Sequence, residues 1–128
     1  MNDQRESLRN QYLFQKLDQY LKTDHRFTCA DLGREDLCKY LCIDRNRFGT
    51  MIKQQAHVAN LRQYLNELRL EYAVRQMREH PNWSILAIAD SCGMSITPFK
   101  RAFKEKYGMP PSKYRTTVID GESSSQSE

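Results

Sequence analysis

Residues 37–52, LCKYLCIDRNRFGTMI, match the pattern of residues 88–103, IADSCGMSITPFKRAF, which stand 51 positions later. In both stretches an apolar residue precedes a small one, and a turn position comes four residues after the small one. An apolar residue and a helix-capping residue follow, and then apolar residues at helical spacing. The matched pairs are Leu37 and Ile88, Cys38 and Ala89, Cys42 and Gly93, Ile43 and Met94, Asp44 and Ser95, Phe48 and Phe99, Met51 and Ala102, and Ile52 and Phe103. The chain therefore contains one unit twice.

The spacing within this unit has a mechanical reason. The small side chain lets two helices cross closely, and the tight turn swings the second helix across the first. This is the pattern of a helix-turn-helix, in which the second helix protrudes far enough to enter the major groove of DNA. Gly93 suits a left-handed turn, whereas Cys42 suits it less well and predicts a turn that is strained or differently shaped.

The remaining sequence also predicts helices and no strands, because no stretch alternates apolar β-branched residues with polar ones. Apolar residues at three- and four-residue steps predict helices over about residues 5–22, 34–41, 45–55, 61–79 and 96–107, with a further helix after Ser84 and a last turn at 111–115. The predicted N-caps are Asp44, Asn60, Ser84 and Ser95. The first helix carries a stripe of Leu8, Tyr12, Leu13, Leu17, Tyr20 and Leu21.

These elements predict an all-α fold with two helix-turn-helix subdomains joined by a long linker helix and preceded by an extra N-terminal helix. The expected segments are an N-terminal helix and connecting loop (1–31), a first helix-turn-helix (32–58), a linker helix (59–80), a second helix-turn-helix with a closing helix (81–115) and a disordered tail (116–128). The linker helix of 19 residues would span roughly 28 Å at 1.5 Å per residue.

Composition excludes several classes of protein. The 128 residues are 39% hydrophobic and 28% charged, which is ordinary for a soluble globular protein. The sequence contains neither a run of about 20 apolar residues nor a secretory signal, so we expect a cytoplasmic protein without membrane contact by this segment. The net charge of +4 is concentrated in residues 95–115, where Glu105 is the only acidic residue. The positive residues of this segment are Lys100, Arg101, Lys104, Lys106, Lys113 and Arg115.

No catalytic or metal-binding arrangement stands out. The four cysteines, at positions 29, 38, 42 and 92, form no CxxC pair, and the three histidines are scattered. We therefore expect reduced, mostly buried thiols, with no metal and no cofactor. The five glycines form no phosphate-binding loop, and no histidine is placed to activate a nucleophile. An enzyme is not expected.

Residues 93–115, GMSITPFKRAFKEKYGMPPSKYR, resemble the C-terminal signature of AraC/XylS-type bacterial transcription regulators, and Leu68-Arg69-Leu70 with Ala73 resembles the linker helix of that family. The resemblance covers about residues 32–115. It implies a homeodomain-like, seven-helix DNA-binding domain of a transcription regulator, and the length of the linker helix would let one chain occupy two successive major grooves. The chain departs from the family pattern at Cys42, in a second turn one residue shorter than usual, and at residues 55–59, where a glycine is expected.

The polar sides of the two expected recognition helices supply the candidate DNA contacts. On the first helix they are Arg45, Asn46, Gly49, Thr50 and Lys53, and on the second they are Thr97, Lys100, Arg101 and Lys104. Asn46 fits adenine, Thr50 a thymine methyl or a base edge, and Arg45 and Lys53 a phosphate or guanine. Arg101 is the expected guanine contact and Lys104 the expected phosphate contact. Gly49 either allows a close approach to DNA or is simply tolerated.

Two functions from different classes remain open at this point. The first is double-stranded DNA binding by the DNA-binding portion of a larger bacterial regulator with an N-terminal sensor domain, or by a free-standing small activator. The alternative is a helical protein-interaction module, for example one that contacts RNA polymerase, without base readout of its own.

Overall fold

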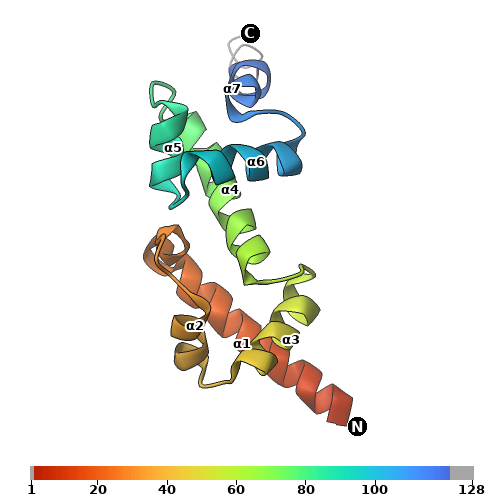
Figure 1. Cartoon of the computed structure of the whole chain (residues 1–128). Coiled ribbons are helices and arrows are strands. Elements are labelled where there is room, and N and C mark those ends of the chain that lie inside the picture. Colours follow the sequence, from red (N-terminus) through yellow and green to blue (C-terminus); the bar gives the residue numbers. More distant parts are fainter. Residues whose placement is uncertain (1, 122–128) are drawn as a thin grey trace. The chain divides into compact units, whose positions relative to one another are not determined.

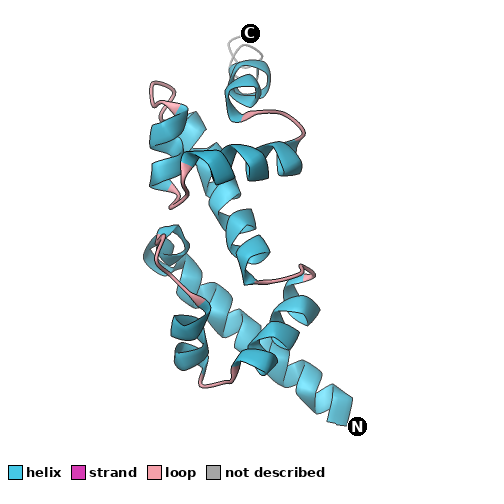
Figure 2. Ribbon diagram, in the orientation of Figure 1, coloured by secondary structure: helices cyan, strands magenta, loops and turns pink. Residues whose placement is uncertain are grey.

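The computed structural model describes residues 2–121, and every regular element in that range is a helix (Figures 1 and 2). None of the described helices is both long and apolar enough to cross a membrane. The elements in chain order are α1 (Asn2–Lys22), the 3-10 helix η1 (Thr23–Thr28), α2 (Arg34–Leu41), α3 (Arg45–Ala56), α4 (Leu61–Glu79), α5 (Ile85–Ser91), α6 (Ile96–Tyr107), α7 (Pro111–Tyr114) and the π-helix η2 (Arg115–Ile119). The predicted all-α fold is confirmed.

The chain divides into two compact units, residues 1–67 and 68–128. The boundary falls inside α4, so the helix predicted as a linker contributes side chains to both cores. In the first unit α2 and α3 pack against α1. Its buried apolar residues are Leu13, Leu17, Leu21, Phe27, Leu37, Cys38, Leu41, Phe48, Met51, Ile52, Leu61, Tyr64 and Leu65.

The core of the second unit is formed by α4, α5 and α6 and is closed by η2. Its buried residues are Leu70, Ala73, Val74, Met77, Ile88, Ala89, Cys92, Met94, Phe99, Phe103 and Ile119. The Phe103 ring lies 4.5 Å from Tyr107 and 5.3 Å from Tyr114, centroid to centroid. This aromatic cluster holds the end of α6 against α7.

The predicted internal repeat is present in the backbone. The bounds of α3 shifted by 51 residues are those of α6, and the start of α2 shifted likewise is the start of α5. Both turns make the same hydrogen bond: the Ile43 N–H donates to the Cys38 carbonyl at 3.1 Å, and the Met94 N–H donates to the Ala89 carbonyl at 3.0 Å. The two copies thus end their first helix by the same 6→1 closure.

Cys42 adopts the same turn conformation as Gly93, with φ of 59° against 82°. The first turn therefore keeps the shape of the second and carries the strain of a side chain in the left-handed region. His57, at the end of α3, has φ of 57° and stands 51 residues before Gly108, which has φ of 78°. The first copy places side chains at both positions where the second has glycine.

Three of the four predicted N-caps are confirmed. The backbone N–H groups of Arg47, Gln63 and Ala87 donate to the side chains of Asp44 (2.7 Å), Asn60 (3.0 Å) and Ser84 (3.0 Å), respectively. Ser95 occupies the predicted position before α6, but its side chain makes no capping hydrogen bond. That part of the prediction is wrong, and the start of α6 relies on backbone geometry and packing.

Three further predictions need correction. Part of the segment predicted as a loop after α1 forms the helical turns of η1, which a kink with left-handed φ values at Asp24 and His25 interrupts, and Phe27 is buried there. Leu8 and Tyr12 are 66% and 63% exposed, so the apolar stripe of α1 faces the core only from Leu13 onward. The prediction of a disordered tail from residue 116 is wrong for its first residues, because η2 continues to Ile119, which is buried; the rest of that prediction, at residues 122–128, lies outside the described range.

Candidate nucleic-acid interface

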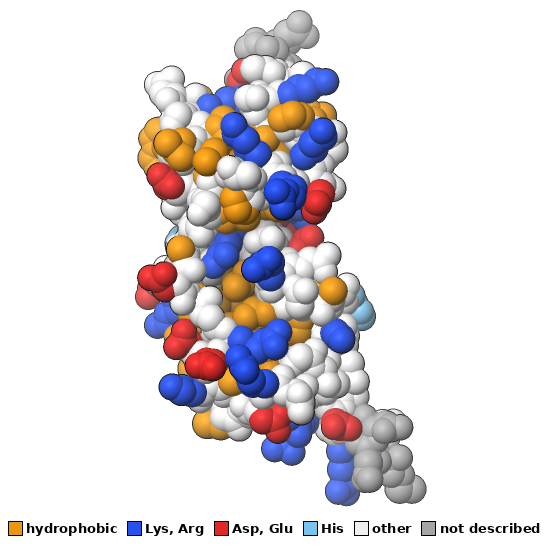
Figure 3. Space-filling view, viewed as in Figure 1, with side chains coloured by type: hydrophobic (Ala, Val, Ile, Leu, Met, Phe, Trp, Pro, Cys, Tyr) orange, Lys and Arg blue, Asp and Glu red, His pale blue; other side chains and the backbone are white. Residues whose placement is uncertain are grey.

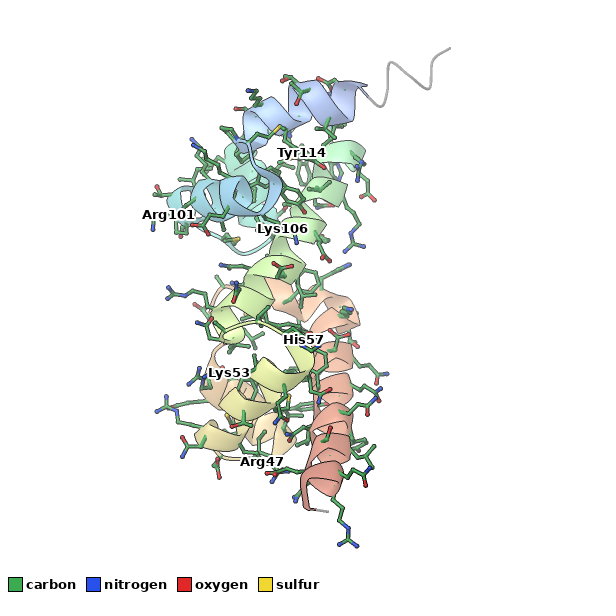
Figure 4. The ribbon with its side chains drawn as sticks, turned by 90° about the vertical axis from the view of Figure 1, so that its right-hand side faces the viewer. Arg47, Lys53, His57, Arg101, Lys106 and Tyr114 are labelled. Carbon is green, nitrogen blue, oxygen red and sulfur yellow. The ribbon has the colours of Figure 1, made fainter. Side chains whose placement is uncertain are left out.

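Burial of one side of α3 turns the predicted contact residues of the first unit outward. Phe48, Met51 and Ile52 are at most 1% exposed and fix the rotation of the helix. The other side presents Arg45, Asn46, Thr50 and Lys53 as exposed residues and Gly49 as a half-buried one. Figure 4 shows Lys53 extending from α3 into solvent. The structure therefore brings all five predicted residues of α3 together on one face.

A hollow runs along this face and includes residues beyond the five predicted contacts on α3. Besides the five predicted residues it is lined by Arg34 at the start of α2 and by Ala59, Asn60 and Leu61 where α4 begins. Arg34 was predictable only as a helix start, because its side-chain direction depends on how α2 crosses α3. The hollow adds a third positive side chain to Arg45 and Lys53.

An exposed ion pair lies beside this hollow. Arg45 Nη2 is 3.6 Å from Glu35 Oε1, and both side chains are more than two thirds exposed. A pair so open to water contributes little to stability. Arg45 can therefore leave Glu35 for a phosphate or a base at small cost.

Gly49 sits in the middle of α3 without a packing reason. A Cβ atom built there meets nothing within 4 Å. A helical glycine costs about 1 kcal/mol relative to alanine, and no intramolecular contact offsets this. Of the two interpretations of Gly49, close approach of a ligand is the one that gives the glycine a function.

The second unit presents its predicted residues in the same way on α6. Thr97, Lys100, Arg101 and Lys104 are all exposed, whereas Phe99 and Phe103 are fully buried. Figure 4 shows Arg101 extending from α6 into solvent. Figure 3 shows blue Lys and Arg side chains spread over the face of this unit that carries α6. Within residues 2–121, Lys100, Arg101 and Lys104 take part in no ion pair.

The two buried thiols, Cys38 and Cys92, are weakly reactive. Burial raises the pKa of the Cys92 thiol to about 12, and burial also raises the pKa of Cys38 against the opposing effect of the Arg34 cation. Both are neutral thiols at physiological pH and poor nucleophiles. Cys29 and Cys42 are exposed, so the expectation of mostly buried cysteines holds for only half of them.

Comparison with known proteins agrees with this geometry. A family model described as a helix-turn-helix domain matches residues 37–117. The raffinose operon transcriptional regulatory protein RafR of Pediococcus pentosaceus is 32% identical over 100 residues, which are 77% of this chain and 34% of that protein. The HTH-type transcriptional regulator GbdR of Pseudomonas aeruginosa is 32% identical over 78 residues, 60% of this chain and 21% of that protein. The chain thus spans about a third of the first relative and about a fifth of the second.

A solved structure is similar over most of the chain. The C-terminal domain of AraT, a response regulator from Geobacillus stearothermophilus, matches with a TM-score of 0.74 and 26% identity, covering 84% of this chain and 86% of that one. A match of this extent reaches beyond the two helix-turn-helix copies into the segment before residue 37, so the shared architecture includes part of the N-terminal region.

Proposed function

Because this chain belongs to the AraC-type family of helix-turn-helix transcription regulators, we propose that it binds double-stranded DNA sequence-specifically by placing α3 and α6 in successive major grooves. The observation that carries this proposal is the repeated unit. Each copy buries one side of its second helix and exposes a polar, basic opposite side. A structural scaffold alone would not need the same exposed arrangement twice.

The proposed contacts follow from the chemistry of the exposed side chains. Arg101 has the fork geometry that guanine O6 and N7 accept, and Asn46 has the donor and acceptor that pair with adenine. Thr50 contacts a thymine methyl or a base edge. A larger set contacts phosphates or flanking bases, and it consists of Arg45, Lys53, Thr97, Lys100 and Lys104.

The linker helix supports binding by both units of one chain. α4 runs without a break for 19 residues, roughly 28 Å at the helical rise. Successive major grooves on one side of the duplex are separated by roughly 34 Å, a distance of the same order as the length of this helix. A stiff linker of this kind requires either bent DNA or partial engagement of one unit.

The proposal also covers a sensor domain in the full-length regulator and the location of the protein in the cell. The chain spans about a third of RafR, which supports an N-terminal sensor domain outside these residues in a larger regulator. Binding to bacterial chromosomal DNA would place the protein in the cytoplasm. Contact with RNA polymerase is the competing role, and it requires an exposed protein-binding face without base readout.

Selection of bound sequences from a pool of random duplexes tests the proposal. The chain should enrich one motif with two parts about a helical turn apart, and its affinity should fall steeply as salt rises because bound cations are released from DNA. Recovery of no motif, together with salt-independent binding to purified RNA polymerase, would favour the interaction module instead.

A further inference from the structure

A second basic hollow lies in the first unit, outside the face just described. It is lined by Arg5, Glu6 and Arg9 of α1 and by Arg47 of α3. α1 packs along α3 there, and the Asn10 side-chain amide donates to Gln54 Oε1 at 2.8 Å farther along the two helices. The hollow therefore joins the N-terminal helix to the first recognition helix and carries three cations against one anion.

Arg47 is the centre of this cluster because its hydrogen-bonding capacity is unused. The side chain is half-buried, and its Nε and Nη2 atoms are inaccessible to solvent and have no hydrogen-bond partner. These two nitrogens lie on one edge of the planar guanidinium, the edge that holds two oxygens of a single anion. Leaving such donors unpaired is costly, so a rotation of the Arg47 side chain that points this edge toward an anion in the hollow would relieve that cost.

Two arginines of α1, Arg5 and Arg9, add positive charge to the hollow and favour an anion there. Arg5 and Arg9 are exposed, and within residues 2–121 neither of them nor Arg47 forms an ion pair. Three like charges around one hollow repel each other, and Glu6 alone does not balance them. A group that binds in this hollow would be anionic, bear several acceptor oxygens and enter from solvent. A phosphate has these properties.

The location of the hollow relates it to DNA. Arg47 follows Asn46 by one position and lies about 100° around α3 from it, on the side toward α1. Figure 4 shows Arg47 near the beginning of α3, with α1 alongside. A helix in the major groove is bordered by phosphates of the DNA backbone, so the side of α3 next to its base-facing residues is where a phosphate arrives.

We propose that Arg5, Arg9 and Arg47 together hold a DNA-backbone phosphate beside the groove that α3 enters. This inference rests on the DNA binding proposed above and adds α1 to the DNA-binding surface. Contacts to phosphate set position and carry no sequence information, so this site strengthens binding to every duplex alike.

The test uses the full 128-residue chain. The variants are the double substitution Arg5→Gln and Arg9→Gln, the single substitution Arg47→Gln, and the control Lys22→Gln, which removes an exposed positive charge from the other end of α1. Affinity is measured from low to high salt on two duplexes of equal length: one selected by the wild-type chain from random sequences and one unrelated. The double variant should bind both duplexes about tenfold more weakly.

The salt dependence gives an independent readout. The slope of log K against log salt should become shallower by about one for each phosphate that the variant no longer neutralises, and Lys22→Gln should leave both slope and affinity unchanged. Arg47→Gln should lower affinity for both duplexes to a similar degree, with its fold checked by circular dichroism. The double variant changes only exposed residues, so it tests the site even where Arg47→Gln perturbs folding.

The outcomes separate the two proposals. Wild-type affinity and slope in the double variant would overturn the phosphate site and leave the DNA-binding function standing. A loss confined to the selected duplex would also overturn it, because base readout is sequence-dependent and phosphate contact is not. Failure of the wild-type chain to bind any duplex would overturn both. Stabilisation of the wild type by inorganic phosphate, with unchanged DNA binding in the double variant, would assign the hollow to a free anion and reject the DNA contact.

Discussion

The first and second helix-turn-helix copies have the same backbone and different side chains at the positions that shape it. In the second copy, glycines take both left-handed positions, and aromatic rings fill the core around Phe103. In the first copy, Cys42 and His57 take those left-handed positions, and the Asp44 cap forms a side-chain hydrogen bond that Ser95 lacks. The second copy therefore has unstrained glycines at its left-handed positions, whereas the first copy has strained side chains there and a helix cap with a side-chain hydrogen bond.

The largest difference should appear on emptying the matched core positions. Phe103→Ala should destabilise the second unit by about 3–5 kcal/mol, because it removes a fully buried ring that packs on Tyr107 and Tyr114. Ile52→Ala at the equivalent position should cost about 2–5 kcal/mol in the first unit. Hydrogen exchange should show reduced protection in α5 to α7 for the first variant and in α2 and α3 for the second. Because α4 is shared, some loss can spread to the other unit, but an equal loss of protection in both units for both variants would contradict two separate cores.

Two residues of α6 should differ in how their substitution affects DNA binding. Arg101→Ala should cost about 1–3 kcal/mol in binding a selected duplex and relax specificity at one base pair, because it removes the side chain that we propose contacts guanine. Lys104→Ala on the same helix should weaken binding to selected and random duplexes alike. Competition binding with single-base variants of the selected site measures both. Equal losses on selected and random DNA for Arg101→Ala would refute its role in base readout.

Exchanging the turn residues tests the strain in the first copy. Gly93→Cys should lower the free energy of unfolding by about 1 kcal/mol, because it places a Cβ atom in the left-handed region. Cys42→Gly should raise it by up to about 1 kcal/mol, reduced by the greater freedom of glycine in the unfolded chain. Urea unfolding of both single variants measures the pair of effects. If the two exchanges change stability in the same direction, the turns differ in more than strain.

The caps should give the smallest contrast. Asp44→Ala should cost about 1 kcal/mol, because it removes the acceptor of the Arg47 N–H. Ser95→Ala should cost only a few tenths of a kcal/mol, since that side chain makes no capping hydrogen bond. Thermal unfolding midpoints of the two variants, measured side by side, check the difference. Equal shifts would show that Ser95 caps α6 in solution.

Local signals predicted most of the fold. The helix starts at Arg45 and Leu61 follow from Asp44 and Asn60, whose side chains bond to the first turns, and the repeat fixed the register of both copies. The left-handed conformation of His57 was also within reach of the sequence, because the shift of 51 residues pairs it with Gly108. Ser95 failed as a side-chain cap because residue type gives the preference and not the rotamer.

Two features could not be predicted from the sequence, because they depend on contacts between segments that are distant in the chain. Ile119 joins the core although its serine-rich, acidic surroundings predict disorder, because one buried side chain outweighs local composition. The cluster of Arg5, Arg9 and Arg47 forms only once α1 packs along α3, about 40 residues away in sequence. The five predicted residues of α3 were found because helical spacing alone places them on one side, and their binding roles stay predictions.

The division of the chain inside α4 has a consequence for folding. Nucleating a helix costs free energy, whereas extending it costs little. Once one half of α4 has formed, the other half can therefore form by extension. Each half of α4 is buried in a different core, at Leu65 in the first unit and at Met77 in the second. Formation of either core therefore favours helix formation in the half of α4 that belongs to the other core. The two halves acquire cooperativity through a shared element, without requiring an interface between them.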